Sequence, residues 1–523
     1  MTLSLHQFKR LRMTYDTIFA RSFSRYDQKK LGYGAFLGCL LIALSFCIVF
    51  KPYLGSLQVL NVRMPVDVGL KMLRITNSYS FEKLRGDDIR SSMATIVNET
   101  SSSEIEMVES DTTGTNETIS NGNAISSSTT TVINNKNITQ QKEMKALCHV
   151  EERTEFCEMY GDIRVDGKSS TVFMAADTML ESGSWVIRPY SRRGDEQAFK
   201  RVRKWFIKSG VDAYETPAQC DQRHNVPAII FSTAGYAGNN FHDYTDIVLP
   251  LYLTSRQFDG EVKFLITNKK PWWIKKFRNI LHKLSRYELV DIDKEVNVHC
   301  FTSVTVGLKR YPQELKIDSS KSPYSMKDFR KFLRSAYSLK KENAINMRDN
   351  GGKKRPRLFI LSRKSTRAFT NTNAIAGMAT RLGYEVVVTE VDSHVARVAE
   401  MVNSCDVMMG VHGAGLTNMI FLPENAILIQ VIPIGGFEWL AETDFGEPSK
   451  DMNLRYIGYQ IKTEESTLIQ QYPQDHEVLN DPYAIQRRGW YEFKSIYLQK
   501  QNVNLDVDRF RITLLRALEL LHQ

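Results

Sequence analysis

The C-terminal third of the chain contains the stretch Cys405-Asp-Val-Met-Met-Gly-Val-His-Gly-Ala-Gly-Leu-Thr-Asn418. Its apolar run at residues 407–411 is typical of a short strand that is buried on both faces in a parallel sheet. His412 and two glycines follow, and glycine is used where the backbone turns sharply or lets another molecule come close. Residues 416–422 are typical of the first turn of a helix. A strand, a glycine turn and a helix N-terminus direct N–H groups to one point, which predicts a site for an anion such as phosphate.

The spacing of these glycines matches neither G-x-G-x-x-G nor a P-loop, so a second interpretation stays open. In that interpretation the stretch is a tight connection between a strand and a helix, and His412 only caps or packs.

A family resemblance favours the first interpretation. Val411-His-Gly-Ala-Gly-Leu-Thr-Asn418, followed by Phe421-Leu-Pro423 and Ile429-Gln-Val431, resembles the nucleotide-sugar-binding segment of glycosyltransferase family 61. The plant branch of that family decorates xylan. The resemblance extends from about Cys148 to the C-terminus.

Length and charge limit the other classes. A chain of 523 residues is long enough for two or three domains. Its formal net charge of +10 is compatible with nucleic-acid binding, but the sequence has no zinc-finger, homeodomain or RRM pattern, so no nucleic-acid partner is predicted. Steering of an anionic nucleotide-sugar or an acidic polysaccharide is the milder explanation of the charge.

Residues 31–50 are apolar and uncharged, and about 20 such residues are needed to cross a bilayer as a helix. The preceding tail, residues 1–30, is more basic than the opposite flank, which predicts a single-pass type II signal anchor with a cytoplasmic tail and a luminal bulk. A cleaved signal peptide is disfavoured by the long leading tail and by Lys51-Pro-Tyr53 at the expected cleavage site.

Residues 51–145 are predicted to form a largely disordered luminal stem. Within them, residues 91–139 are rich in Ser, Thr and Asn and bury too little apolar surface to offset the entropy of ordering. Three N-glycosylation acceptor sites lie there, at Asn98, Asn116 and Asn137.

Five cysteines lie beyond the apolar segment, and they contain no C-x-x-C pair, so a zinc site is not expected. In an oxidising compartment Cys148–Cys157 is the preferred disulfide and Cys220–Cys300 the second choice. Cys405 is then left as a buried thiol.

Two successive series of alternating strand and helix patterns occupy residues 146–345 and 346–523. Each series predicts an open parallel sheet with covering helices. Residues 349–355 have the composition of a linker, and the amphipathic residues 508–521 are expected to cross back over the first half. Two such Rossmann-like domains facing a cleft form the GT-B architecture, which the family resemblance also implies. The first is then the acceptor domain and the second binds the nucleotide-sugar.

Two loops of the second series are expected to hold the donor diphosphate. Arg363 and Arg367 follow a buried strand and can each form paired hydrogen bonds with phosphate, although a solvated basic turn is the alternative. The family resemblance implies a donor role for Arg363, Arg367 and Asn371. The full set of predicted substrate-binding residues is Ser362, Arg363, Arg367, Asn371, His412, Gly413, Gly415, Thr417, Asn418 and Glu438, the last as a ribose ligand.

An inverting transfer needs one general base to deprotonate the acceptor hydroxyl. The sequence offers His242, Asp243 and Asp246 in a loop of the first series that is expected to face the cleft. The alternative for Asp243 is that it caps the following helix.

Asp291-Ile-Asp293 and Asp506-Val-Asp508 have the spacing used by metal-dependent GT-A transferases. Such pairs are common by chance in loops, and two arginines with a helix N-terminus would already neutralise a diphosphate. We therefore expect no metal ion and no cofactor, and the Asp-x-Asp pairs mark the metal-dependent alternative.

The family resemblance, together with the predicted membrane topology, implies a Golgi membrane glycosyltransferase that moves a pentose from a UDP-sugar onto xylan with inversion. The resemblance implies arabinofuranose in α-1,3 linkage or xylose in β-1,2 linkage. Two alternatives stay open: an enzyme like the family's protein O-linked N-acetylglucosaminyltransferases, and a catalytically silent glycan-binding scaffold subunit. The sequence does not indicate an oligomeric state.

Overall fold

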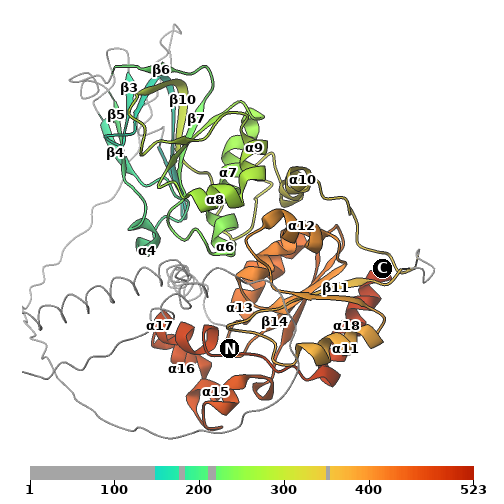
Figure 1. Cartoon of the computed structure of the whole chain (residues 1–523). Helices are drawn as coiled ribbons and strands as arrows, with labels where there is room; N and C mark the ends of the chain where they lie inside the picture. Colours follow the sequence, from blue (N-terminus) through green and yellow to red (C-terminus); the bar gives the residue numbers. More distant parts are fainter. Residues whose placement is uncertain (1–147, 176–182, 210–218, 349–353) are drawn as a thin grey trace, which may run out of the picture. The chain divides into compact units, whose positions relative to one another are not determined.

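The computed structural model describes residues 148–175, 183–209, 219–348 and 354–523 (Figure 1). All of them fall within one compact unit. The predicted tail, membrane anchor, stem, three glycosylation sites and most of the linker at residues 349–355 lie outside the described residues. Among the helices of those four ranges, none is both long and apolar enough to cross a bilayer.

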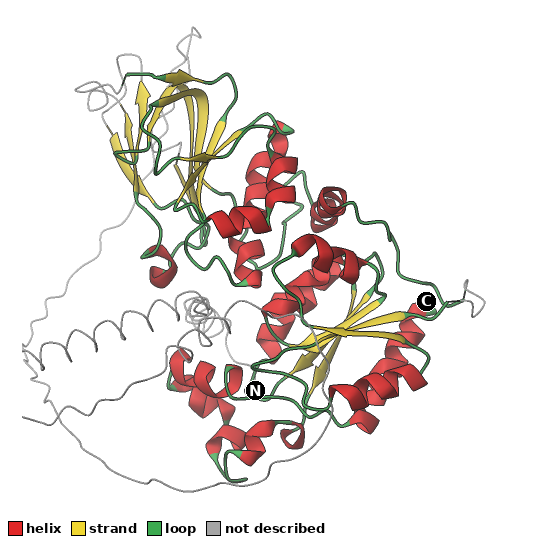
Figure 2. Ribbon diagram, in the orientation of Figure 1, coloured by secondary structure: helices red, strands yellow, loops and turns green. Residues whose placement is uncertain are grey.

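The fold is mixed α/β, with two sheets and helices packed beside them (Figure 2). The ten strands of the first sheet are β1 (Cys148–Val150), β2 (Glu155–Asp166), β3 (Thr171–Ala175), β4 (Gly183–Ile187), β5 (Trp205–Ser209), β6 (Gln222–Arg223), β7 (Ala228–Ser232), β8 (Lys263–Thr267), β9 (Val290–Asp291) and β10 (His299–Gly307). Its helical segments are α4 (Glu196–Phe199), α6 (Asn240–His242), η3 (Asp243–Val248), α7 (Leu249–Ser255), η4 (Arg256–Phe258), α8 (Pro271–Lys276) and α9 (Arg278–Leu284). Helix α10 (Met326–Tyr337) follows them in the chain.

The prediction of an open parallel sheet in the first half is wrong for part of it. Strands β10, β7, β8 and β9 are parallel, but β2 pairs antiparallel with both β10 and β3. Antiparallel neighbours need only a short turn between them, and residues 167–170 supply it between β2 and β3. The parallel part is the part that leads into the helices α6 to α9.

The second sheet is parallel throughout, with strand order β12-β11-β13-β14-β15. The strands are β11 (Arg357–Leu361), β12 (Glu385–Thr389), β13 (Val407–Val411), β14 (Ile427–Ile432) and β15 (Arg455–Gln460). The chain order reverses between β11 and β13, and in such sheets ligands bind beyond the carboxyl ends of the strands at the point of reversal. The loops that begin at Ser362 and His412 lie at this point.

The helical segments of the second half are α11 (Thr372–Arg381), α12 (Val395–Asn403), η5 (Ala414–Phe421), α13 (Glu438–Ala441), η6 (Glu442–Gly446), α14 (Glu447–Asp451), η7 (Thr463–Glu465), η8 (Thr467–Gln470), α15 (Glu477–Asn480), α16 (Pro482–Arg487), α17 (Trp490–Phe493), η9 (Lys494–Leu498) and α18 (Val507–Leu521). Two predicted details are corrected. The segment after β13 is a 3-10 helix rather than an α-helix, and the sequence pattern of a helix at residues 393–403 is met by α12, which begins two residues later. In η5, Asn418 bonds back to the carbonyl oxygen of Gly415, which suits the tighter turn.

One hydrophobic cluster joins the two halves of the described chain. It contains Phe231 and Phe264 of the first sheet together with Phe359 and Met408 of the second. Arg330 of α10 reinforces this junction, since its buried guanidinium donates to the carbonyl oxygens of Ile420, Leu422 and Met452. The second sheet is therefore braced against the helices of the first.

Disulfide bonds join Cys148 to Cys157 and Cys220 to Cys300. Both belong to the first sheet and its approaches, where Cys157 lies on β2 and Cys300 on β10. Cys405 is a buried free thiol just before β13.

Candidate functional site

The loops after β11 and β13 meet where the strand order reverses. Nη1 of Arg367 donates a 2.8 Å hydrogen bond to the carbonyl oxygen of His412. Gly413 has φ of +148°, and a Cβ atom there would lie 2.7 Å from Nη1 of Arg367 and 3.0 Å from Nη1 of Arg363. Because no real Cβ tolerates such contacts, glycine is required for both guanidinium groups to approach the turn.

Arg367 is held in a backbone conformation that its type rarely adopts, with φ of +54°. Its N–H donates to the carbonyl oxygen of Gln501 at 2.8 Å, and the N–H of Ala368 donates to the side chain of Asn502 at 2.9 Å. Strained backbone of this kind persists where the surroundings fix it, and it clusters at ligand sites. The segment around Gln501 therefore positions the guanidinium of Arg367.

Arg363 and Arg367 form no ion pair with a carboxylate of the described residues, although the charge of Glu390 acts on Arg363 from a greater distance. Among the described residues, no carboxylate lies within ion-pair distance of Arg363 or Arg367, and the buried Nε of Arg367 has no hydrogen-bond partner. Burial, and then the neighbouring charge of Arg363, lower the pKa of Arg367 well below its usual value. Two adjacent cations in a partly dehydrated place without a carboxylate are a site that an anion completes.

His412 is a neutral donor in this arrangement. Nε2 of Gln430 donates to its Nδ1 at 2.7 Å, and the hydroxyl of Tyr456 donates to Oε1 of Gln430 at 2.9 Å. Since Nδ1 accepts, the hydrogen of the neutral ring is on Nε2. Burial, followed by the charges of Arg367 and Arg363, lowers the pKa of His412 to about 3, so the ring is uncharged near neutral pH.

A cavity of about 290 Å³ opens beside these groups. Arg367, His412 and Gly413 line it, and Thr366 and Ala414 extend this wall. The first half of the chain contributes Asn239 and Phe241, and the C-terminal part contributes Trp490, Lys494, Leu498 and Gln499. The ring of Phe241 contacts that of Phe445 at 5.7 Å, so the cavity lies between the two halves of one compact unit.

Asp444 supplies the one carboxylate among the residues that line this cavity in the described part of the chain. It is buried and lies in η6, a π-helical turn. Of the other two π-helical turns in the described ranges, η9 also lines the cavity, through Lys494 and Leu498, whereas η3 begins two residues after Phe241 and contributes no lining residue. Such turns are rare and occur frequently at functional sites.

Several predicted binding residues lie elsewhere. The side-chain amide of Asn371 exchanges hydrogen bonds with the backbone of Leu505, at 2.7 and 3.2 Å. Thr417 and Asn418 are buried in η5 and do not line the cavity, and neither does Gly415, where a Cβ would meet Leu361 at 2.8 Å. Ser362 and the exposed Glu438 are likewise outside its lining. These predicted binding residues therefore contact other parts of the protein and do not line this cavity.

The three predicted base candidates are all fully buried. Asp246 accepts hydrogen bonds from Tyr190, Thr245, His242, Arg192 and Arg310. Asp243 accepts from the N–H of Gly238 and the indole of Trp273, both at 2.9 Å, and from Lys276 at 2.6 Å. Although burial opposes it, the charge of Arg192 and then that of His242 hold the pKa of Asp246 well below its usual range. This network stabilises the fold, and none of its three members lines the cavity.

Both Asp-x-Asp pairs have structural partners. Asp293 accepts hydrogen bonds from Thr267 and the N–H of Asn268 and pairs with Arg203 at 2.9 Å. Asp506 caps the N-terminus of α18 by accepting from two backbone N–H groups at 3.1 Å.

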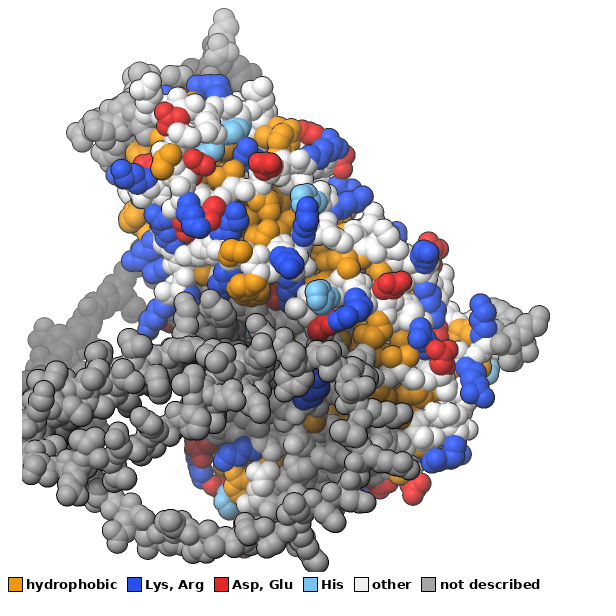
Figure 3. Space-filling view, viewed as in Figure 1, with side chains coloured by type: hydrophobic (Ala, Val, Ile, Leu, Met, Phe, Trp, Pro, Cys, Tyr) orange, Lys and Arg blue, Asp and Glu red, His pale blue; other side chains and the backbone are white. Residues whose placement is uncertain are grey.

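The basic charge is dispersed on the surface in view. On the face in Figure 3, Lys and Arg side chains alternate with acidic, apolar and neutral groups. The positive charge without an ion-pair partner that geometry singles out is the half-buried pair Arg363 and Arg367.

Sequence reasoning missed Asp444, Trp490 and Lys494. Each lies in a short helical segment after residue 438, where the pattern of alternating strands and helices ends. The segment Glu442-Thr-Asp-Phe445 matches no known motif. Asp444 comes to the same cavity as the turn after β13 only through the fold.

Comparison with known proteins gives consistent matches. The family model described as Glycosyltransferase 61 matches residues 270–429, which include Arg363, Arg367 and His412. An alpha-1,3-arabinosyltransferase of Oryza sativa subsp. japonica is 46% identical over 385 residues, which cover 72% of this chain and 66% of that protein. A beta-1,2-xylosyltransferase of the same organism is 43% identical over 387 residues, covering 71% of this chain and 83% of that protein.

A xylan glycosyltransferase of Arabidopsis thaliana is 35% identical over 398 residues, covering 72% of this chain and 80% of that protein. The chain thus spans slightly less than two thirds of the arabinosyltransferase and most of the other two relatives.

Proposed function

Because this chain belongs to glycosyltransferase family 61, we propose that it is an inverting pentosyltransferase that acts on xylan. The donor is a UDP-pentose, and the acceptor is a hydroxyl of the xylan backbone. The names of its relatives support this choice, since they specify arabinosyl transfer, xylosyl transfer and a xylan acceptor.

The observation that carries the proposal is the unopposed pair Arg363 and Arg367 beside Gly413. When the sugar leaves its donor, UDP gains negative charge, and fixed guanidinium groups in a partly dehydrated site stabilise that charge without reorganising. His412 adds a neutral donor, Nε2–H, to a phosphate oxygen. We infer that the diphosphate lies across this turn.

We further propose that Asp444 is the general base, in place of the networked Asp243 and Asp246. One carboxylate oxygen of Asp444 takes the proton of the acceptor hydroxyl while the oxygen of that hydroxyl attacks C1 of the pentose. The bond between C1 and the phosphate oxygen breaks on the opposite face, and UDP departs with the bonding electrons. This assignment is supported by the position of Asp444, which lines the same cavity as Arg367.

The other expectations remain proposals that accompany this one. We propose a GT-B architecture with a boundary near residue 346, a type II Golgi anchor at residues 31–50, glycosylation of Asn98, Asn116 and Asn137, and transfer without a metal ion. The arginine pair supports the last of these, because it supplies the positive charge that a metal would bring.

The test is transfer by the full-length chain from each UDP-pentose to xylo-oligosaccharides, with the product linkage read by NMR. Asp444→Asn is expected to lower kcat at least a hundredfold and to leave UDP affinity within about threefold. Glu442→Gln is the matched control, because Glu442 lies in the same π-helical turn but pairs with Lys450 outside the cavity. Full activity of Asp444→Asn, or transfer from no UDP-pentose by the wild-type chain, would contradict the respective proposal.

A further inference from the structure

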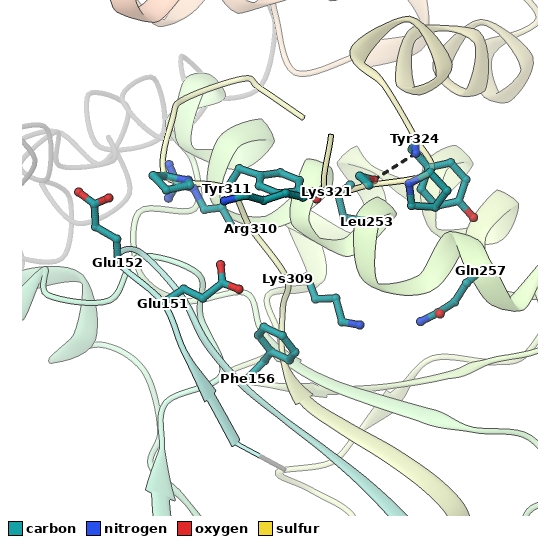
Figure 4. Close-up of a pocket in the computed structure, with 13 residues that line it drawn as sticks. Glu151, Glu152, Phe156, Leu253, Gln257, Lys309, Arg310, Tyr311, Lys321 and Tyr324 are labelled. Atoms are coloured by element: carbon teal, nitrogen blue, oxygen red, sulfur yellow. Dashed lines mark hydrogen bonds between the residues drawn. The ribbon is translucent and has the colours of Figure 1, made fainter. Parts of the chain in front are cut away.

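A second and larger cavity, of about 610 Å³, lies in the first half of the chain. Figure 4 shows Phe156 and Lys309 on one side of it and Tyr311 and Lys321 on the other. Gln257, which lies in η4 directly after α7, also lines the cavity. Tyr324 and Glu151 are two further lining residues on which the following argument depends. A volume of this size holds a ligand of several rings.

The walls of this cavity are fixed by buried contacts. Arg310 pairs with Glu314 at 2.6 Å and with Asp246 at 3.1 Å, which anchors the backbone between Lys309 and Tyr311. The N–H of Lys309 donates to Oγ1 of Thr254 at 2.9 Å. On the other side, the ring of Tyr324 packs against that of Tyr252 at 5.5 Å. A ligand would therefore meet a largely formed surface and pay little ordering entropy.

The chemistry of the lining favours a neutral polyhydroxylated ligand. Tyr311 and Tyr324 line the cavity with half-buried aromatic rings from the connection between β10 and α10, whereas the buried ring of Phe156 packs against His149 and Lys309. The cations Lys309 and Lys321 are matched by acidic side chains at the same rim, among them Glu151, and Lys309 itself pairs with Glu158 at 2.8 Å. Lys309 and Arg310 therefore have carboxylate partners, in contrast to Arg363 and Arg367, so an anion has less to gain here. Sugar rings offer C–H faces to aromatic groups and hydroxyls that both donate and accept.

The second cavity is connected to the donor cavity by one continuous helical run. Phe241 at the start of the run lines the donor cavity, and Leu253 near its end lines the second cavity. The segments α6, η3 and α7 join them without a break, a separation on the order of 20 Å at the helical rise per residue. A polysaccharide chain of several residues spans such a distance, whereas a mono- or disaccharide does not.

We propose that this second cavity binds the backbone of the acceptor polysaccharide, several sugar residues away from the residue that is glycosylated. The inference rests on the proposed function for the identity of the polysaccharide, xylan, and it assigns Tyr311 and Tyr324 as sugar-stacking residues. It predicts that the enzyme prefers long acceptors over short ones.

The experiment measures KM for long xylan and for xylobiose with the full-length chain, together with binding of xylohexaose and of UDP. Tyr311→Ala and Tyr324→Ala are each expected to raise KM for long xylan about tenfold, the contribution of one aromatic contact. KM for xylobiose and the affinity for UDP are expected to stay within twofold. Gln257→Ala, which changes an exposed side chain and spares the core, is expected to raise KM for long xylan about threefold.

Tyr160→Ala is the matched control, since Tyr160 is an exposed aromatic residue of the same half that lies outside the cavity. Equal losses on long and short acceptors, or unchanged KM for both in all three variants, would overturn the inference. If the wild-type chain transfers no pentose but binds xylohexaose in a manner that depends on Tyr311, the proposed function fails and the second site stands. If the wild-type chain transfers pentose but its binding of xylohexaose does not depend on Tyr311, the proposed function stands and the second site fails.

Discussion

Two groups of arginines in this molecule, one buried and one half-buried, differ in their counter-charges. Arg192 and Arg310 belong to the first half of the chain, and each forms ion pairs with both Asp246 and Glu314, at 2.6 to 3.1 Å. Arg363 and Arg367 lie at the carboxyl edge of the second sheet and have no carboxylate partner among the described residues. Against the effect of burial, Asp246 and Glu314 raise the pKa of Arg192, whereas burial and Arg363 lower that of Arg367.

The difference separates charges that stabilise the fold from charges that await a ligand. In the first group, Arg192 and Arg310 with Asp246 and Glu314, which we call the closed group, desolvation is offset by internal ion pairs. Removing one member leaves the others uncompensated. In the second group, Arg363 and Arg367, which we call the open group, desolvation is not offset by an ion pair among the described residues. The site is therefore ready to bind an anion, but the unpaired charges lower the stability of the fold. Three measurements test this division.

The largest effect is expected from Asp246→Asn. This change leaves Arg192 and Arg310 buried with one counter-charge fewer, so the free energy of unfolding should fall by about 3–5 kcal/mol. Urea unfolding of the full-length chain followed by fluorescence measures it. Asp259→Asn is the control, because Asp259 forms an exposed ion pair with Arg256 and should change nothing measurable. A loss as small as the control's would mean that the closed group is not structural.

Arg367→Ala is expected to act on binding instead of stability. UDP affinity should fall about 30- to 150-fold, the equivalent of roughly 2–3 kcal/mol for a charge-assisted contact. The free energy of unfolding should change little, because Arg367 forms no ion pair with a carboxylate of the described residues and loses only its hydrogen bond to the carbonyl oxygen of His412. Lys364→Ala, in the same loop but exposed and paired with Glu390, should change UDP affinity less than twofold. Isothermal titration with UDP measures both, and a destabilised Arg367→Ala that still binds UDP would reverse the division.

The smallest effect concerns pH. The pKa of His412 is about 3 in the folded chain and about 6.5 when unfolded, so between these values the unfolded state binds a proton that the folded state does not. The free energy of unfolding therefore falls as pH drops from 6.5, by at most about 1.4 kcal/mol per unit from this group. His412→Gln should lose less stability than the wild type between pH 6.5 and 4.5. Parallel unfolding curves for the two proteins would contradict a buried, uncharged His412.

The closed group titrates in a lower window. Although burial opposes it, Arg192 and Arg310 lower the pKa of Glu314 to about 2, so its stabilising contribution is present above its unfolded pKa near 4.5 and is lost only as pH falls toward 2. As the pH falls, the stability linked to His412 should therefore be lost before the stability linked to Glu314.

The sequence predicted the second sheet better than the first, for a physical reason. Val407–Val411 is a continuous apolar run, and the structure has a fully buried strand with those bounds. Such runs are the signature of parallel strands covered on both faces. Strand β15 escaped prediction because Arg455-Tyr-Ile-Gly-Tyr-Gln460 mixes polar and apolar residues and contains a glycine.

The candidate site was predictable where it depended on local backbone chemistry. Gly413 and the two arginines follow buried strands, so the rule for parallel sheets brings them together. Asn371 has the same loop position but turns to the backbone of Leu505, which lies 134 residues away. Asp444 reaches the cavity through η6, and no local pattern announces a π-helical turn. Contacts over such sequence separations depend on the assembled fold.

The strand-like pairing of residues 367–370 with residues 501–503 has a practical consequence. All five strands of the second sheet precede residue 461, so a chain cut short after residue 499 would retain them. It would nevertheless lose the template that holds Arg367 in its left-handed conformation. Truncation or fusion near the C-terminus is therefore a change to the donor site, and expression tags are better placed at the other end of the protein.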